Sequence, residues 1–329
     1  TDSVFVRLAG DYSDDRSSNK DGHRLVPGLV SGIPVLSDVF DSRGAITTIP
    51  TSNAGLQQQV KFGGVGLTVE WNINERWSFK SVTAYREDES ESLIDFDSGP
   101  LDDFDAPVVY ENDQLSQEFQ LTFRGERLTG IVGAYYLDAN AFDAFDVVLG
   151  TLTFSPALPG VTSFTLGDFE TKAWAVYADA SYDFNEQWSL SVGGRYTSDE
   201  RTGSVTRATY LGKGSPYFGN TAYFQLPGAP PFTGSRKDTD FSPRVSLAFK
   251  PGEAHNLYVS FSQGFKGGSF DPRGVYVAGS EVREGFRPET VDSFEIGAKS
   301  RWADGRASTN LTLFLADYTK YLTFSKHRV

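Results

Sequence analysis

Hydrophobic and polar residues alternate strictly along residues 64–79, whose sequence is GVGLTVEWNINERWSF. The odd-numbered residues from Val65 to Ile73 are apolar, whereas the even-numbered residues from Gly66 to Asn72 are small or polar. A short turn at Asn74 to Arg76 leads into a second run that begins at Trp77. A period of two is typical of a β-strand whose two faces meet different surroundings. The pattern predicts a half-buried β-hairpin whose apolar face contacts either a protein core or lipid.

The same hairpin pattern recurs along the chain. Pairs of alternating segments are again separated by short turns, near Gly125, Glu186, Gly252 and Gly305. With a leading strand at Val4 to Tyr12, the pattern predicts about eleven strands. The further hairpins lie at residues 115–137, 174–196, 243–265 and 294–318.

The predicted connections alternate between tight turns and long loops. In an up-and-down sheet this alternation places every tight turn at one end and every long loop at the other, as in outer-membrane barrels. Long loops without secondary structure are uncommon in compact soluble domains. The sequence therefore predicts an all-β fold, a transmembrane antiparallel up-and-down β-barrel. The predicted long loops are Ser13 to Gly63, Asp88 to Asn112, Asn140 to Leu166, Ser198 to Lys237 and Gly267 to Thr290.

Aromatic and charged residues support this interpretation. Trp77, Trp188 and Trp302 lie beside three different tight turns, with Phe184 and Phe249 at similar depth, which is typical of the aromatic girdle at a membrane interface. Charges inside the strands are expected to point into a wet lumen, because a charge on the lipid face costs about 2–4 kcal/mol near the midplane. These charged residues are Lys80, Glu118, Arg195, Arg244 and Glu295.

Composition excludes several classes of function. The net charge of −13 argues against nucleic acid as a partner, because phosphates require clustered Lys and Arg. The chain has no cysteine, and its three histidines, His23, His255 and His327, lie far apart, so no metal centre built on thiolate or histidine ligands and no cofactor is predicted. Catalytic signatures are absent, and the many carboxylates lie in loops rather than along a defined cleft. We therefore expect that the protein is not an enzyme.

Several short motifs carry a family resemblance. The run from Tyr258 to Phe270, followed by Phe286-Arg-Pro-Glu-Thr290 and Glu295-Ile-Gly297, resembles the late strands of the barrel domain of TonB-dependent outer-membrane receptors. Gly194-Arg-Tyr-Thr197 and Ser81-Val-Thr-Ala-Tyr-Arg86 resemble two earlier strands of that family. Together the motifs follow the family order over nearly the whole chain.

The resemblance implies a barrel of about 22 strands in the outer membrane of a Gram-negative bacterium, surrounded by lipid. Such receptors are closed by an N-terminal plug domain, through which the TonB energy-coupling complex drives import of a scarce, large nutrient such as a ferric siderophore. Residues 1–329 are then expected to form a partial barrel domain, with the plug domain and the remaining strands absent from this chain. This expectation rests on the predicted strand number and on a sequence that opens directly on a strand.

The predicted loops contain two sets of candidate ligand-binding residues. Arg273, Arg283 and Arg287 could meet an anionic ferric siderophore, although ion pairing with neighbouring acidic residues is an equally simple role. Tyr210 and Tyr217 could stack on a planar or sugar-like ligand, although loop aromatics ordinarily pack on one another.

A third set of loop residues could bind a hard cation such as calcium, because carboxylate oxygens are its preferred ligands. The alternative is a solvated acidic loop at the cell surface, since the spacing fits no known calcium loop. These carboxylates are Asp95, Asp97, Asp102, Asp103 and Asp105.

Two alternatives to an active-transport receptor remain open at this point. A passive outer-membrane channel or structural barrel would share the hairpin pattern but lack a plug. A secreted β-sandwich that binds glycans would place the apolar faces against a core and would be soluble without detergent.

Overall fold

The computed structural model describes residues 3–17, 28–30, 33–35, 59–96, 104–150, 160–272, 274 and 281–319. Strands make up most of this part of the chain, together with one short 3-10 helix, η1 (Glu281–Glu284). None of its helices has the length and apolar character needed to cross a bilayer. The long strands are β1 (Val4–Asp15), β4 (Gln59–Asn72), β5 (Trp77–Asp95), β6 (Phe104–Arg124), β7 (Leu128–Leu149), β8 (Val161–Asp183), β9 (Trp188–Leu211), β11 (Phe232–Gly252), β12 (His255–Lys266), β13 (Glu289–Trp302) and β14 (Ala307–Thr319).

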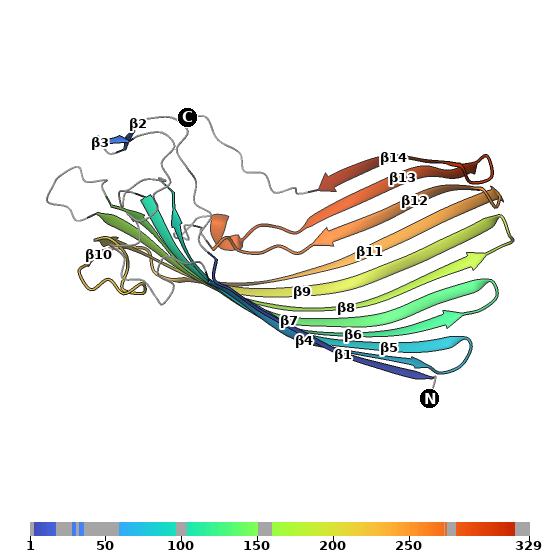
Figure 1. The fold of residues 1–329 in the computed structure, drawn as a ribbon, viewed down its shortest axis with the longest axis horizontal. Coiled ribbons are helices and arrows are strands. Elements are labelled where there is room, and N and C mark those ends of the chain that lie inside the picture. The colour runs from blue at the N-terminus through green and yellow to red at the C-terminus, as the bar shows by residue number, and fades with distance from the viewer. Residues whose placement is uncertain are drawn as a thin grey trace.

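These strands form one curved antiparallel sheet in which chain neighbours are sheet neighbours (Figure 1). The order is β1-β4-β5-β6-β7-β8-β9-β11-β12-β13-β14, and the short β10 (Phe224–Leu226) pairs with the end of β9, which makes twelve strands. The short β2 (Gly28–Val30) and β3 (Ile33–Val35) form a separate hairpin. The predicted up-and-down meander of about eleven strands is confirmed. A β-sandwich is wrong for this chain, because its long strands form a single sheet.

All tight turns lie at one end of the sheet, and the described parts of the longer connections lie at the other (Figure 1). Two of these turns share the sequence Asn-Glu-x-Trp and the same local geometry. The Asn74 side-chain oxygen accepts hydrogen bonds from the backbone N–H groups of Arg76 and Trp77 at 2.9 and 3.0 Å. Asn185 does the same for Gln187 and Trp188 at 2.9 Å each. A short Asn side chain can thus close a turn by itself, which explains its use there.

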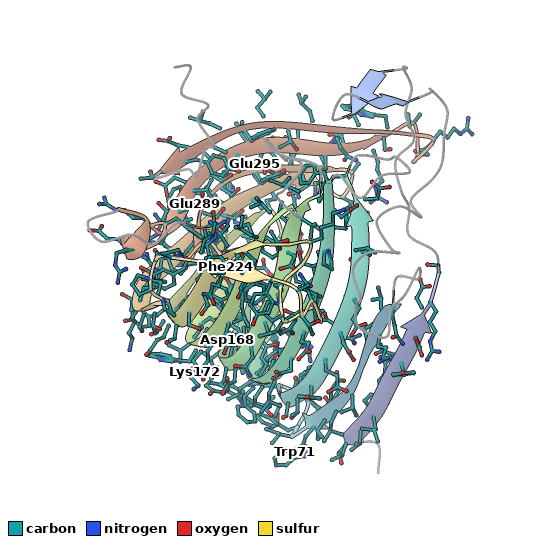
Figure 2. The ribbon with its side chains drawn as sticks, turned by 90° about the vertical axis from the view of Figure 1, so that its left-hand side faces the viewer. Trp71, Asp168, Lys172, Phe224, Glu289 and Glu295 are labelled. Atoms are coloured by element: carbon teal, nitrogen blue, oxygen red, sulfur yellow. The ribbon has the colours of Figure 1, made fainter. Side chains whose placement is uncertain are left out.

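Two aromatic belts bound the apolar face of the sheet. On five strands an aromatic residue beside the tight turn has an aromatic partner eight residues along the same face: Trp77 and Tyr85, Tyr182 and Trp174, Trp188 and Tyr196, Phe249 and Phe241, and Trp302 and Phe294. Eight residues span about 26 Å along a strand. At the ~40° tilt usual in such barrels this spacing gives about 20 Å of height before the rings are counted, close to the ~25 Å apolar band of outer-membrane barrels. The segments between the belts are the membrane-spanning parts. Trp71 and Lys172 lie on the outer side of the curved sheet (Figure 2).

The strands run much further past the second belt than the sequence predicts. β8 has 23 residues and β9 has 24, although about 9–11 are enough to span a membrane. Much of the sequence predicted as loop at residues 88–112, 140–166 and 198–237 is therefore strand. The prediction failed because strict alternation requires one uniformly apolar face, whereas beyond the bilayer neither face is uniformly apolar although the backbone ladder continues. Of the predicted loop at residues 267–290, residues 267–272 and 285–288 lie outside the long strands as expected, whereas Glu281–Glu284 form η1 and Glu289 and Thr290 already belong to β13.

The ladder register settles which residues share a face. Val65, Leu67, Val69 and Trp71 share the outer, apolar face with Leu8 of β1 and its neighbours at the same parity. Every in-strand charge predicted to avoid lipid lies at a position of the opposite parity, on the inner face. The predicted inner-face residues, all confirmed by the register, are Lys80, Glu118, Arg195, Arg244 and Glu295.

Two apolar clusters lie beyond the second belt, on opposite faces of the sheet. The first includes Val148, Phe164, Tyr210 and Phe218 and covers the continuation of the outer face. The second consists of Val205, Phe232 and Phe270, with Phe169 packed against it, and lies on the inner face. The connections at this end thus fold back onto both sides of the wall.

Candidate functional site

The inner face between the belts is lined by polar side chains that pair across strands. The Lys80 Nζ lies 2.8 Å from a Glu70 oxygen of the neighbouring strand. Arg244 of β11 forms an ion pair with Asp179 of β8. Because its charges pair across strands in this way, the inner face is a hydrated, rigid surface rather than a second apolar face.

Two tyrosines lie flat on this wall, each over a glycine. A Cβ at Gly133 would be 2.3 Å from the Tyr177 ring, and a Cβ at Gly297 would be 2.4 Å from the Tyr258 ring. The Tyr177 hydroxyl donates to Glu118 at 2.7 Å. In the second case Tyr258 donates in the same way to Glu295.

This geometry explains the Glu295-Ile-Gly297 motif physically. Glu295 and Gly297 lie two residues apart and therefore on the same face, where one holds the Tyr258 hydroxyl and the other leaves room for its ring. An aromatic ring that covers a strand glycine replaces side-chain contacts which the glycine lacks.

Arg195 accounts for the Gly-Arg-Tyr-Thr motif. Its guanidinium lies 5.6 Å from the Tyr135 ring centre and 5.8 Å from that of Tyr177. Its Nε donates to the Thr197 hydroxyl at 3.1 Å. Tyr196, between Arg195 and Thr197, belongs to the second aromatic belt on the outer face, so residues 195–197 contribute side chains to both faces of the wall.

A hollow of about 610 Å³ lies on the inner face beyond the second belt. Arg86 in its lining donates two hydrogen bonds to Asp11, at 2.9 and 2.8 Å. Asn112 donates to Asp88 at 2.7 Å. The hollow thus presents carboxylates and amides, with its arginine already held by a carboxylate. Its lining residues include Phe62, Arg86, Asp88, Asn112, Gln114 and Phe169.

The candidate ligand-binding residues do not converge on one site. Arg283 lies 5.1 Å from the centre of the Phe232 ring on the inner face, and Arg287 is exposed nearby in sequence. Tyr210 belongs instead to the first apolar cluster, on the outer face beyond the second belt. Tyr217 lies beside the same cluster, with its ring centre 5.7 Å from that of Phe164. Burial raises the pKa of both tyrosines. Arg273 lies outside the described residues.

The candidate cation-binding residues are partly described. Asp95 and Asp105 face each other across β5 and β6, are buried, and lie in strands rather than in a loop. Asp97, Asp102 and Asp103 lie outside the described residues. Within the part of the chain that the structure describes, no three acidic or histidine side chains are placed to hold a metal ion together.

Sequence reasoning missed a fully buried carboxylate, Asp146, close to this pair. The backbone N–H of Ser215, which is 69 residues away, donates to its Oδ2 at 2.7 Å. Nearby, Gly214 N–H donates to the Thr162 hydroxyl at 2.7 Å, and that hydroxyl donates to the Gly212 carbonyl at 2.8 Å. Burial raises the pKa of Asp146 from 3.8 to about 6. No local sequence signal marks this residue, because a distant connection buries it.

A single curved meander with a belted apolar outer face and a charged inner face defines the wall of a transmembrane β-barrel. Residues 1–327 match the family described as TonB dependent receptor-like, beta-barrel. The chain belongs to this family, whose members are outer-membrane transport receptors of Gram-negative bacteria rather than enzymes.

Solved structures show the same fold at low sequence identity. The chain is similar to the ferric yersiniabactin uptake receptor FyuA from Yersinia pestis, with a TM-score of 0.65 and 14% identity over 95% of this chain and 42% of that one. It is similar to the siderophore receptor PiuA from Acinetobacter baumannii, with a TM-score of 0.60 and 13% identity over 94% and 47% of the two chains.

It is also similar to the ferric-catecholate import receptor Fiu from Escherichia coli K12, with a TM-score of 0.57 and 15% identity over 96% and 48%. The chain spans less than half of the length of each of these three structures.

Proposed function

We propose that this chain forms part of the barrel wall of an active-transport receptor that imports a scarce, large nutrient such as a ferric siderophore. The observation that carries the proposal is the contrast between the two faces of one wall. The outer face between the two aromatic belts is mostly apolar, and Gln117 of β6 there is hydrogen-bonded to Thr83 and Ser81 of β5, whereas the inner face carries paired charges and a polar hollow. Family membership and the fold of three siderophore receptors support it.

Residues 1–329 act in this proposal as a partial barrel domain of a longer receptor. Supporting this, β1 and β14 each pair with one strand only within the described sheet. An unpaired strand edge in lipid is costly, because its backbone groups find no water there. Further strands would close the wall, and a plug domain would fill the lumen and link it to the TonB complex.

The inner face offers the plug and the nutrient different surfaces. The paired charges between the belts suit a polar, close-fitting protein domain. The hollow beyond them suits a large polar nutrient, because amides and carboxylates line it together with two aromatic residues, Phe62 and Phe169.

Uptake by cells tests this function. The full-length receptor is expressed in a strain that lacks its own copy, and uptake of a panel of radiolabelled ferric siderophores is measured with the TonB system intact or deleted. We expect uptake of at least one compound that depends on both the receptor and the TonB system. Receptor-dependent uptake that survives loss of TonB and of the proton-motive force would instead identify a passive channel.

A further inference from the structure

The two ends of the β12–β13 connection lie against the inner face of β9 and β11. We name residues 267–270 the first stem and residues 284–286 the second stem. Ser269 and Phe286 join the stems as an isolated bridge, in which the Phe286 N–H donates to the Ser269 carbonyl at 2.9 Å. Any contact that holds one stem to the wall therefore also restrains the other.

A single ion pair on β11 contacts both stems. Arg236 donates two hydrogen bonds to Asp238, each at 2.8 Å. Asp238 also accepts a hydrogen bond from the Gly268 N–H of the first stem at 3.0 Å. Arg236 also donates to the Glu284 carbonyl of the second stem at 3.2 Å. The anion thus holds one stem and the cation holds the other.

The first stem approaches the wall closely because two glycines begin it. A Cβ at Gly268 would lie 2.2 Å from the Phe286 carbonyl oxygen and 2.5 Å from the Arg236 Cζ. A Cβ at Gly267 would lie 2.7 Å from an Asp199 oxygen. Larger residues would push the stem away from the ion pair.

An apolar contact accompanies the ion pair. Phe270, only 4% exposed, covers Gly203 and Gly234, which face each other on β9 and β11. Its ring centre lies 5.4 Å from that of Phe232. Phe169 packs against this cluster and also lines the inner hollow, so the position of Phe270 bears directly on the wall of the hollow.

We propose that Arg236 and Asp238 form a latch that fastens both stems of the β12–β13 connection to the inner wall, and that the stems release together when it opens. Its components are shielded, because the Arg236 and Asp238 side chains are 15% and 12% exposed. The Arg236 hydrogen bonds lower the pKa of Asp238, so the pair stays ionised in mildly acidic surroundings. Release would free Phe270 and widen the hollow beside Phe169.

Hydrogen exchange of the full-length protein in detergent tests the latch. We expect Arg236→Gln to speed exchange in both stems by about tenfold or more, because the hydrogen bond to the Glu284 carbonyl is lost and Asp238, without its ion-pair partner, holds the Gly268 N–H less firmly. Arg201→Gln is the matched control. Arg201 faces Arg236 across the ladder and holds Asp199 at 2.9 and 3.1 Å, and among the described residues it donates to Asp199 alone.

A charge-swapped variant separates a latch from a merely structural ion pair. Arg236→Asp combined with Asp238→Arg keeps the ion pair. It also removes the like charges that face each other across the ladder, Arg236 opposite Arg201 and Asp238 opposite Asp199. It cannot hold either stem, because Arg accepts no hydrogen bond from Gly268 and Asp donates none to Glu284. We expect fast stem exchange with unchanged protection in the rest of β11.

Three results would overturn the proposal. The first is slow stem exchange in the charge-swapped variant. The second is an effect of Arg201→Gln equal to that of Arg236→Gln. The third is faster exchange of the second stem alone in Arg236→Gln, since this would show that the stems move independently. If the swapped variant does not fold, the comparison of the two single Gln variants still decides between these outcomes.

Discussion

We expect the connection between β9 and β11 to dock onto the wall more tightly at low pH, because the carboxylate of Asp146 is buried beneath it. Asp146 lies ten residues beyond Tyr136, which faces Trp174 of the second aromatic belt across the ladder, and is therefore outside the membrane-spanning segment of β7. Its pKa is raised by burial from 3.8 to about 6. Between these two values the docked state binds more protons than the open one, so docking loses stability as pH rises through this window and is weakest above about pH 6. A shift of this size corresponds to about 3 kcal/mol.

Asp146→Asn removes this penalty while it keeps an oxygen that can accept the Ser215 N–H. At pH 7 we expect the free energy of local opening to rise by about 1–3 kcal/mol, the lower value applying if the new amide N–H groups stay unpaired. The assay is hydrogen exchange of Gly214 and Ser215 between pH 4 and 8, corrected for the intrinsic exchange rate. Asp168→Asn, an exposed carboxylate on β8, is the control.

The expected pattern is specific in sign and in range. In the natural protein the opening free energy falls between about pH 4 and pH 6 and is then level, whereas in Asp146→Asn it is flat throughout. An opening free energy that is independent of pH, or that rises with pH, would refute the reasoning. An equal response in Asp168→Asn would show that general surface charge, rather than the buried group, is responsible.

Two further substitutions, each with a matched control, test the role of a glycine beneath a tyrosine ring and the assignment of the outer and inner faces. Gly297→Ala should destabilise the sheet by about 1–3 kcal/mol in chemical unfolding of the lipid-reconstituted protein, because its Cβ would lie 2.4 Å from the Tyr258 ring. Gly66→Ala is the control and should be nearly neutral, because its Cβ would meet only a carbonyl oxygen at 3.9 Å. Val245→Arg should lower the free energy of unfolding by about 2–4 kcal/mol in the same assay, because Val245 lies on the outer face midway between the belts. Ser246→Arg on the inner face should be tolerated. Equal effects of the two substitutions would contradict the assignment of the outer and inner faces.

The faces of the strands could be predicted from the sequence because alternation is a local property. Once Val65 and its neighbours are placed toward lipid, the tight turns carry the parity from strand to strand. The inner position of Arg195 follows from this rule. Tyr210 shows where the rule stopped too early, because counting in twos from Tyr196 places it on the outer parity. Its predicted place in a loop hid that signal.

The contacts of the latch and of Asp146 could not be predicted in this way. Ser215 meets Asp146 across 69 residues, and Gly268 meets Asp238 across 30. Each contact depends on how a connection folds back over the wall, and no period in the sequence encodes that path. The two Gly residues of the first stem mark a close approach, but only the register shows what is approached.

The second aromatic belt separates two physical regimes of one continuous wall. Between the two belts the outer face meets lipid, so it is mostly apolar, and polar side chains there such as Gln117 and Thr83 are hydrogen-bonded to one another. Beyond the second belt both faces are free to carry charge, as Asp138 shows on the outer face of β7, where its carboxylate accepts a hydrogen bond of 3.2 Å from the Tyr136 hydroxyl. The hollow, the latch and the Asp146 cluster all lie on this side, where the longer connections gather. Because the opposite end of the sheet carries only tight turns, sequence changes can accumulate at the loop end without disturbing the part of the wall that must match the bilayer.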